Sequence, residues 1–283
     1  MGGQISQWQK MVFYRMALPM KAAADPGDTV RPSIARIRDY WLGGSHNREI
    51  DRTFADHAAM CVPHVPYLVR AQRTLLRRMV RYLSAQGVRQ FLDLGSGVPA
   101  LGQVHEIAQR IDPRARVVYV DDEPGVAAEG RELLTGNANA EYLYADLRCY
   151  TAVLRQATLL DLTEPVALLA IDTMQHIQDD DDPRGVIRGY LDAMCPGSFL
   201  AMSHYGPDQQ LMTGYGLFDR MGFGPRPSVN LRDRRALETF FTGLHLVEPG
   251  VVPVPLWHPD PDDEDLIRNP ERVPITAGVA EKP

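Results

Sequence analysis

The chain has 283 residues with a formal net charge of −6, and 45% of the residues are hydrophobic. This length and composition indicate a globular protein with one large domain, or with a core domain and an appended segment, and they exclude a disordered chain. The acidic balance offers no chain-wide attraction to nucleic acid or to an anionic membrane, so we expect neither as a partner.

The cysteines are few and scattered, at Cys61, Cys149 and Cys195. An odd number without a C-x-x-C pair argues against a disulfide framework, so we expect a reducing, cytoplasmic setting. The apolar runs are shorter than a membrane span, and Arg15 interrupts the N-terminal apolar stretch that a signal peptide would need. We expect no metal site, because the acidic run 179–182 lacks spaced ligands and histidine partners.

Residues 1–65 are predicted to form a helical cap rather than an independent domain. They contain an amphipathic stretch at 8–16, a Pro/Gly/Asp break at 25–28, and a helix that begins near residue 34 and ends at two glycines. This segment is too short and too interrupted to bury a large core of its own. It carries the aromatic residues Trp8, Phe13, Tyr14, Tyr40 and Trp41.

Residues 66–283 are predicted to form an α/β core. A long helix runs from residue 66 until Gly87, because apolar side chains recur there at helical spacing. Short apolar strands then alternate with helices, which indicates a mostly parallel sheet with helices on both faces. A Gly/Pro-rich insertion at 206–230 interrupts the alternation. The predicted strands are 90–94, 116–120, 141–145, 166–171, 198–202, 244–254 and 275–279, and the predicted helices are 101–111, 126–134, 151–159, 185–194 and 231–243.

A glycine-rich turn follows the first predicted strand. Gly95, Ser96 and Gly97 stand where the strand gives way to a helix, and glycines there let the backbone approach a ligand closely. The spacing up to Ala100 also fits the dinucleotide fingerprint. Asp93, two residues before the first glycine, would repel a pyrophosphate but suits a ligand that carries an ammonium and a sulfonium. These residues therefore favour S-adenosylmethionine.

Two further acids stand at the ends of the next two strands. Asp121, which Asp122 follows, is placed to accept hydrogen bonds from ribose hydroxyls. Asp146, which Leu147 follows, is placed to accept from an adenine amino group, although an acid at such a position is also a common helix cap. Ligands of open α/β sheets bind at the carboxyl edge, so acids on three successive strands indicate a nucleoside site there.

Several segments of the chain together carry a family resemblance. They are Pro32-Ser33-Ile34-Ala35-Arg36, residues 39–47, 90–99, 117–121, 146–148, 179–183, 196–198 and the tail segment 254–257. In this combination the chain resembles a bacterial family of S-adenosylmethionine-dependent methyltransferases long catalogued as a domain of unknown function. The resemblance runs from about residue 31 to the C-terminus. It implies the class I methyltransferase fold, a Rossmann-like sheet of seven strands of which the last is antiparallel.

The acceptor site is expected beyond the fourth and fifth strands. His204 is our first choice as the base, with Tyr205 beside it and Asp172 and His176 as further candidates. A histidine that only hydrogen-bonds a loop is the alternative reading of His204. The segment 172–176 also departs from the more apolar sequence usual in the family, so we expect an unusual acceptor.

Two residues outside the turn are further candidates for holding the cofactor. Tyr40 is placed in a lid over it, and packing of the helix end is the alternative. Arg73 is our choice among four arginines on one helix face for pairing with the cofactor carboxylate, and a solvated stripe is the alternative.

These observations predict a methyltransferase that uses S-adenosylmethionine, releases S-adenosylhomocysteine and acts on a small molecule. The aromatic residues of the cap favour a flat acceptor, such as an aromatic or indole natural product of secondary metabolism, methylated on carbon, nitrogen or oxygen. They would serve packing equally well. An NAD(P)-dependent oxidoreductase and a non-catalytic S-adenosylmethionine-binding protein are the alternatives, while the acidic charge disfavours nucleic-acid methylation. The oligomeric state stays open, a homodimer included.

Overall fold

The computed structural model describes residues 31–98, 102–225, 227–261 and 269–283. The amphipathic stretch predicted at 8–16 and the break predicted at 25–28 lie outside these ranges. Residues 32–283 form one unit.

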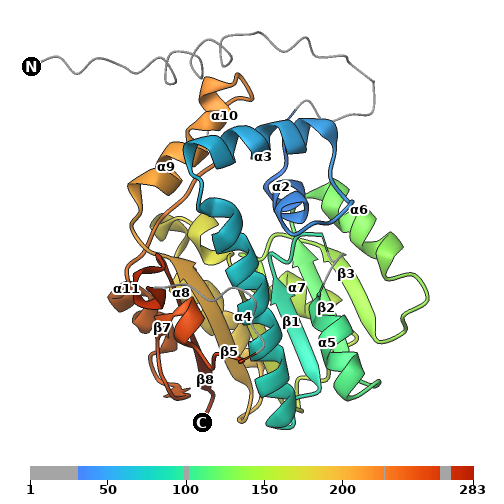
Figure 1. Ribbon diagram of the computed structural model, residues 1–283. Helices are drawn as coiled ribbons and strands as arrows, with labels where there is room; N and C mark the ends of the chain where they lie inside the picture. Colours follow the sequence, from blue (N-terminus) through green and yellow to red (C-terminus); the bar gives the residue numbers. More distant parts are fainter. Residues whose placement is uncertain (1–30, 99–101, 226, 262–268) are drawn as a thin grey trace, which may run out of the picture. The chain divides into compact units, whose positions relative to one another are not determined.

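A mostly parallel sheet forms the centre of this unit (Figure 1). Its strands are β1 Gln90–Leu94, β2 Arg116–Asp121, β3 Ala140–Tyr144, β4 Val166–Ala170, β5 Phe199–Tyr205, β6 His245–Leu246, β7 Val252–Pro253 and β8 Ile275–Glu281. Seven of them follow the order β3-β2-β1-β4-β5-β8-β6, and the short β7 also pairs with β8. Neighbours from β3 to β5 are parallel, whereas β8 is antiparallel to β5, β6 and β7. This order confirms the predicted class I methyltransferase fold.

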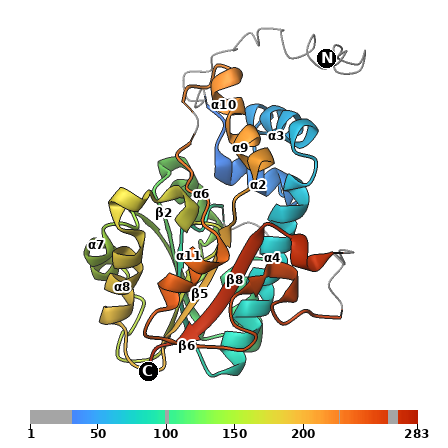
Figure 2. The same cartoon turned by 90° about the vertical axis from the view of Figure 1, so that its left-hand side faces the viewer.

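Helices cover both faces of the sheet (Figures 1 and 2). Their bounds are α2 Ile34–Trp41, α3 Glu49–Cys61, α4 Val65–Ala85, α5 Val104–Ile111, α6 Pro124–Leu133, α7 Tyr150–Gln156, α8 Pro183–Ala193, α9 Gln209–Tyr215, α10 Leu217–Arg220 and α11 Arg234–Glu238. Alternate residues of each strand face opposite layers. Phe91 of β1 packs with α4, α5 and α6, while Leu92 and Leu94 pack with α7, α8 and the segment after α11. Every residue of β1 and β4 is therefore buried, which explains why β4 is apolar throughout.

β5 is longer than the sequence predicts. The predicted end is Met202, but Ser203, His204 and Tyr205 continue the strand, because they pair with residues 275–277 of the antiparallel β8. His204 and Tyr205 consequently lie inside the sheet rather than in a loop beyond it. In this position the side chain of His204 is fully buried, which limits its access to a substrate.

Helices also occur where none is predicted. α3 occupies a segment without a predicted element, and α9 and α10 lie within the predicted Gly/Pro-rich insertion. Asp208 caps α9 by accepting from the backbone N–H of Gln210 and Leu211. The predicted helix 231–243 is only α11 followed by a 3₁₀ turn, and the predicted strand 244–254 is two dipeptide strands.

The helices α2, α3, α9 and α10 gather beyond the carboxyl ends of the strands (Figures 1 and 2). They enclose a small apolar core in which the rings of Phe54 and Phe218 lie 4.3 Å apart, with Ile37 and Ala58 beside them. We call these four helices the cap. α2 ends at Trp41, shortly before Gly43 with its positive φ of 79°, as the sequence predicts.

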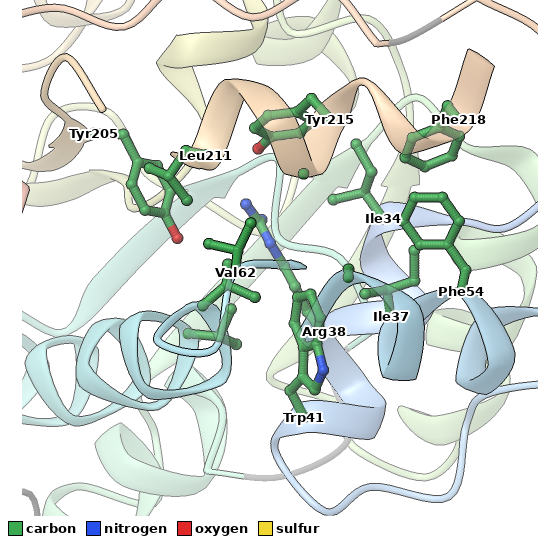
Figure 3. Close-up of a pocket in the computed structure, with 14 residues that line it drawn as sticks. Ile34, Ile37, Arg38, Trp41, Phe54, Val62, Tyr205, Leu211, Tyr215 and Phe218 are labelled. Atoms are coloured by element: carbon green, nitrogen blue, oxygen red, sulfur yellow. The ribbon is translucent and has the colours of Figure 1, made fainter. Parts of the chain in front are cut away.

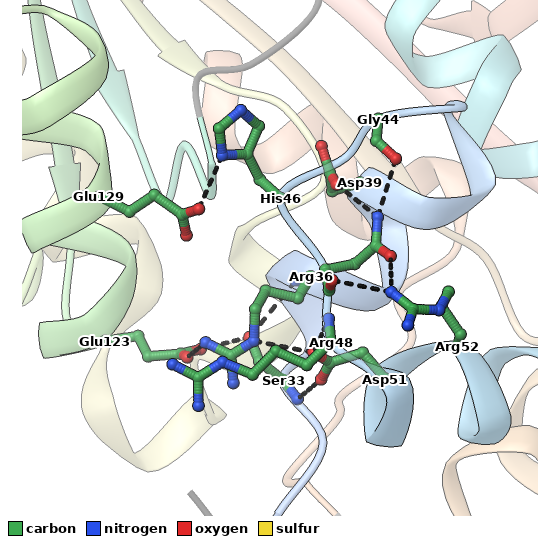
Figure 4. Close-up of polar contacts among 11 residues, drawn as sticks. Ser33, Arg36, Asp39, Gly44, His46, Arg48, Asp51, Arg52, Glu123 and Glu129 are labelled. Atoms are coloured by element: carbon green, nitrogen blue, oxygen red, sulfur yellow. Dashed lines mark hydrogen bonds and ion pairs between the residues drawn. The ribbon is translucent and has the colours of Figure 1, made fainter. Parts of the chain in front are cut away.

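Arg36 ties the cap to the sheet (Figure 4). Its Nε donates to Oδ2 of Asp51 on α3 at 2.9 Å, and its Nη1 donates to Oε1 of Glu123 at 2.9 Å. Ser33 adds a second link, since its Oγ donates to Oε2 of Glu123 at 2.6 Å and its backbone N–H donates to Asp51. Asp51 is fully buried and Arg36 is 4% exposed, so each charge depends on its partners for solvation.

We expect Arg36→Met to destabilise the protein by about 3–5 kcal/mol, because it leaves the buried Asp51 without its counter-charge. Urea unfolding followed by circular dichroism measures this loss. The double variant Arg36→Met/Asp51→Asn should recover part of it. The exposed pair of Arg234 and Glu238 supplies the control, and Arg234→Met should cost about 0–1 kcal/mol. Equal losses in the two single variants would contradict the prediction.

Candidate functional site

The carboxyl edge of the sheet brings the predicted acids together. Asp93 lies in β1, Asp121 ends β2, and Asp172 follows β4 by two residues. Adjacent strands run parallel, so these three side chains come from neighbouring positions along one edge. The glycine turn after β1 lies among them.

Both glycines of the turn are required by the backbone. Gly95 and Gly97 have φ values of 63° and 64°, in the left-handed region that disfavours other residues. A Cβ on Gly95 would also overlap the side chain of Thr173, whose Oγ1 donates to the Leu94 carbonyl at 2.8 Å. Ser96 completes the turn, with its Oγ 3.0 Å from the hydroxyl of Tyr142. The chain is therefore held in a tight curve with its backbone exposed to a ligand.

Asp93 lies beneath the turn and is 5% exposed. Burial raises the pKa of Asp93 to about 7, although the guanidinium of Arg73 acts to lower it. Arg73 projects from α4, and its Nη1 donates to the Gly102 carbonyl at 3.4 Å. The structure thus brings the predicted acid and the predicted arginine to the same side of the turn.

Asp121 accepts two backbone hydrogen bonds at the end of β2. Its Oδ2 accepts from the Gly97 N–H and its Oδ1 from the Glu123 N–H, each at 3.0 Å. Burial raises the pKa of Asp121 to about 6, while these two hydrogen bonds act to lower it. Each carboxylate oxygen has a second lone pair for a ribose hydroxyl. Asp122 beside it is exposed.

Asp146 and Leu147 follow β3 but are engaged with other residues. The Asp146 carboxylate accepts from Arg148, with a shortest distance of 2.7 Å, and this hydrogen bond lowers the pKa of Asp146. The carbonyl of Leu147 accepts from the hydroxyl of Tyr190 at 2.8 Å. Both residues lie at the carboxyl edge, where Arg148 already engages the Asp146 carboxylate.

The helix α2 covers the glycine turn. A Cβ built on Gly97 would lie 3.5 Å from the Cβ of Ala35, so the small side chain of Ala35 permits this close approach. Tyr40, also on α2, uses its hydroxyl elsewhere, because this group donates to Asp56 of α3 at 3.1 Å. Sequence reasoning missed Ala35, although it lies in the segment that carries the family resemblance.

The donor set around the turn fits S-adenosylmethionine. Asp93 and Asp121 supply negative charge for an ammonium, a sulfonium and ribose hydroxyls, and Arg73 supplies positive charge for a carboxylate. A dinucleotide would place its pyrophosphate near the two carboxylates, with Arg73 as the nearby counter-charge. The charges around the turn therefore agree with the prediction, made from Asp93, that the site favours S-adenosylmethionine over a dinucleotide.

A cavity lies under the cap, with a volume of about 550 Å³ that includes the space at its opening. We call it the cap pocket. Its walls come from α2, α3, α4, α9, α10 and the last residue of β5 (Figure 3). Most lining side chains are apolar, among them Ile34, Ile37, Trp41, Phe54, Leu211 and Phe218.

The polar end of the cap pocket is built on Asp172 and Arg38. The Nη2 of Arg38 lies 2.6 Å from Oδ2 of Asp172, and its Nη1 donates to the Asp172 carbonyl at 3.2 Å. Asp172 has a positive φ of 59° and donates its backbone N–H to Ser203 Oγ at 3.0 Å. The hydroxyls of Tyr205 and Tyr215 point toward the Arg38 guanidinium (Figure 3).

The predicted base His204 does not reach this pocket. Its side chain has no exposed surface, its Nδ1 bonds the Tyr205 carbonyl at 2.9 Å, and its Nε2 lies 3.0 Å from Nη1 of Arg232. Burial lowers the pKa of His204 to about 4. This geometry corresponds to the alternative reading of His204, in which the ring serves hydrogen bonding. It holds Arg232, which also pairs with Asp179 at 2.7 Å.

His176 and Tyr205 lie closer to the pocket. The ring of His176 is 6.2 Å from the ring of Tyr215, and its Nε2 is buried and lacks a hydrogen-bond partner among the described residues. Burial and the Arg38 charge lower the pKa of His176 to about 4. Tyr205 lines the pocket directly. Burial raises the pKa of Tyr205 well above its usual value, so its hydroxyl stays protonated.

Comparison with known proteins identifies the family. The model of the S-adenosyl methyltransferase family matches residues 20–283, so the chain belongs to this family and is an S-adenosylmethionine-dependent methyltransferase. A crystal structure of a DUF574 family protein from Streptomyces avermitilis is 36% identical with a TM-score of 0.82, over 90% of this chain and 99% of that chain. A protein from Thermobifida fusca, named as a candidate methyltransferase, is 34% identical with a TM-score of 0.80, over 92% and 99%.

A curated relative matches over a shorter region. The ornithine lipid N-methyltransferase of Singulisphaera acidiphila is 32% identical over 82 residues, which is 29% of this chain and 42% of that protein. The chain thus matches less than half the length of this relative.

Three absences concern only the parts of the chain that the structure describes. No helix there has both the length and the apolar character needed to cross a membrane. No group of three or more histidine, cysteine, aspartate or glutamate side chains there could hold a metal ion. Cys61, Cys149 and Cys195 form no disulfide.

The raised pKa values of two acids predict a pH dependence of cofactor binding. Burial raises the pKa of Asp93 to about 7 and that of Asp121 to about 6, and only the ionised carboxylates carry the charge that attracts a sulfonium. The affinity for S-adenosylmethionine should therefore fall as the pH is lowered from 7.5 to 5, by up to about tenfold per pH unit for each group that takes up a proton. Calorimetry over this range measures it.

Two variants separate the contributions. Asp121→Asn should weaken binding at pH 7.5 by about 1.5–3 kcal/mol, the usual size for a hydrogen bond to a charged group. It should also remove the part of the pH dependence centred near pH 6. Asp93→Asn should remove the part near pH 7. A flat profile in the wild-type protein would contradict both assignments.

Proposed function

We propose that this methyltransferase acts on a small molecule with a flat, apolar body that binds in the cap pocket. The observation that carries the proposal is the lining of the pocket, which is apolar on all sides except at Arg38 and two tyrosine hydroxyls. A concave, mostly apolar lining with a few converging polar groups is typical of sites for small-molecule ligands. An aromatic or indole natural product, as expected from the sequence, has this shape.

The position of the pocket supports the same conclusion. Arg38 of α2 lines the pocket, and Ala35 on the same helix approaches the glycine turn. Tyr205 lines the pocket at the end of β5, next to β4 and the Asp172 that follows it. The acceptor would therefore bind against α2, with its polar end over the ends of β4 and β5. Methyl transfer requires the reacting atoms at roughly 3–3.5 Å, so the methyl group of the bound cofactor would have to reach that polar end.

The proposed cofactor residues are those predicted from the sequence. The turn of Gly95, Ser96 and Gly97 would hold the methionine part together with Asp93 and Arg73. Asp121, with Asp122 beside it, would hold the ribose, and Asp146 and Leu147 would bind the adenine. When bound, S-adenosylmethionine supplies the methyl group. Tyr40 would contribute to the lid through its hydrogen bond to Asp56 rather than by touching the cofactor.

The proposed roles near the acceptor differ from the first expectation. Tyr205 is the predicted residue that lines the pocket, and Asp172 would hold Arg38 there. His176 stays a candidate acceptor of a proton, because its neutral Nε2 has no partner in the described structure. His204 would act as a positioning residue for Arg232. The N-terminal segment predicted as a helical cap is 1–65, of which residues 31–65 are described and contribute α2 and α3 to the cap.

Filling the cap pocket should separate acceptor binding from cofactor binding. Ala58→Phe introduces a ring into the pocket, and we expect kcat/KM for accepted naphthalene or indole compounds to fall at least about tenfold, the effect of roughly 1.4 kcal/mol. Affinity for S-adenosylhomocysteine should stay unchanged. S-adenosylhomocysteine formation and calorimetry give the two readouts.

The control for this substitution is Ala128→Phe on the exposed surface of α6, which should change neither quantity. Full activity of Ala58→Phe toward the same compounds would show that the acceptor binds elsewhere. Thermal unfolding of both variants checks that a loss of activity is not a loss of folding.

A further inference from the structure

Arg38 is the charged residue among those that line the cap pocket. Its side chain is 21% exposed, and its partner Asp172 is 8% exposed. A guanidinium in the wall of an apolar cavity restricts what the cavity can bind. The inference below rests on the proposed function, because it concerns the polar group of the acceptor in that pocket.

The Asp172 carboxylate is already committed to neighbouring side chains. Its Oδ2 accepts from Arg38 at 2.6 Å, and its Oδ1 accepts from Nε2 of Gln175 at 2.5 Å. The Asp172 carbonyl accepts a further bond from Arg38. Asp172 is therefore placed to orient the arginine, and the group it presents to the pocket is the guanidinium.

The Arg38 guanidinium retains donors beyond those that Asp172 uses. It is a planar fork of five N–H groups, of which Nη1 and Nη2 each direct one to Asp172. A further one bonds the Tyr215 hydroxyl, and the remaining donors can serve a ligand. It lies between the hydroxyls of Tyr205 and Tyr215 (Figure 3). The Asp172 carboxylate raises the pKa of Arg38, although burial acts to lower it, so the charge persists at working pH. The polar end thus combines a fixed cation with two hydroxyl groups.

We infer that the acceptor carries a weakly acidic hydroxyl, a phenol or an enol, and that Arg38 holds its oxygen for O-methylation. Arg38 is then the residue that determines which head group the pocket accepts. The tyrosine hydroxyls flank the same oxygen, and the apolar walls take the body of the molecule.

Charge balance favours this head group over two others. An aliphatic ammonium would lie against the guanidinium, and the Asp172 carboxylate that could offset it is occupied by Arg38 and Gln175. A carboxylate would enter already charged and would lose its hydration in an apolar cavity, which costs several kcal/mol. A phenol enters neutral and becomes an anion only beside the cation that stabilises it.

The reaction balances without a base from the protein. The hydroxyl proton passes to bulk solvent as the oxygen comes to rest against Arg38, whose charge lowers the pKa of the hydroxyl. A lone pair of the oxygen then forms the O–CH₃ bond while the CH₃–S bond breaks, and its electron pair stays on sulfur. The products are the methyl ether and S-adenosylhomocysteine, and Arg38 stays protonated throughout.

Three naphthalene compounds of matched shape test this inference: 2-naphthol, 2-(aminomethyl)naphthalene and 2-naphthoic acid. With S-adenosylhomocysteine present, calorimetry should show the tightest binding for 2-naphthol, by about tenfold or more over the other two. The ultraviolet spectrum of bound 2-naphthol should show ionisation at a lower pH than in water. With S-adenosylmethionine, 2-naphthol should be the compound that yields S-adenosylhomocysteine.

The variants assign these effects to Arg38. Arg38→Met alone leaves Asp172 unpaired and risks misfolding, so Arg38→Met/Asp172→Asn is the main variant, with no unpaired charge. It should bind 2-naphthol about tenfold more weakly and return its ionisation to the value in water. Arg38→Lys should keep part of the ionisation shift, because it keeps the charge without the fork. Arg234→Met, on the exposed α11, is the control and should behave as the wild type.

The outcomes distinguish the inference from the proposed function. Equal binding of the three compounds, preferential binding of the amine or the acid, or an unshifted ionisation of bound 2-naphthol would overturn the inference and leave the apolar pocket as proposed. Retention of the 2-naphthol preference and of the ionisation shift in the double variant would also overturn it. If none of the three compounds binds while S-adenosylhomocysteine does, the proposed acceptor pocket itself fails and the inference with it.

Discussion

The arrangement of the site depends on two arginines that lie two positions apart on α2. Side chains at such a spacing point to opposite sides of a helix. Arg36 accordingly reaches Asp51 and Glu123, while Arg38 reaches Asp172. These ion pairs fix α2 on both sides of the carboxyl edge of the sheet. They determine how closely the helix covers the glycine turn and which of its faces enters the cap pocket.

Because α2 is anchored in this way, only a few side chains connect the proposed ribose site at Asp121 to the cap pocket. The Glu123 carboxylate accepts from Arg36 of the cap, and the Glu123 N–H donates to Asp121, the proposed ribose acid. On its other side the same helix lines the cap pocket with Arg38. A displacement of α2 would therefore change both regions together. Arg36 is buried and Asp51 is fully buried. Moving α2 away from the sheet would separate these two charges where water cannot solvate them, which disfavours such a movement.

The parts of the structure that could be predicted from sequence are those specified by local pattern. β1 has its predicted bounds because a short, mostly apolar stretch ends at a glycine turn, and both signals are adjacent in the chain. The end of β5 depends on pairing with β8 about 70 residues later, so the predicted strand stops at Met202 and His204 is expected just past its end. α3 was missed because it buries two alanines beside Phe54 and so has a weak apolar pattern. The role of Arg38 depends on Asp172, 134 residues away in sequence, and no local pattern indicates that pair.

The charges at the carboxyl edge of the sheet depend on how these acids and arginines are placed. Asp93, Asp121 and Asp172 face the two guanidinium groups of Arg73 and Arg38, so full ionisation would leave one unbalanced negative charge. Burial limits this excess by raising the pKa of Asp93 to about 7 and that of Asp121 to about 6. S-adenosylmethionine brings an ammonium and a sulfonium against one carboxylate, which is the net positive charge that the ionised acids match. At the proposed cofactor site, methyl transfer would remove the sulfonium charge, so the product S-adenosylhomocysteine would be less well balanced than the methyl donor, and the change in charge would itself favour product release.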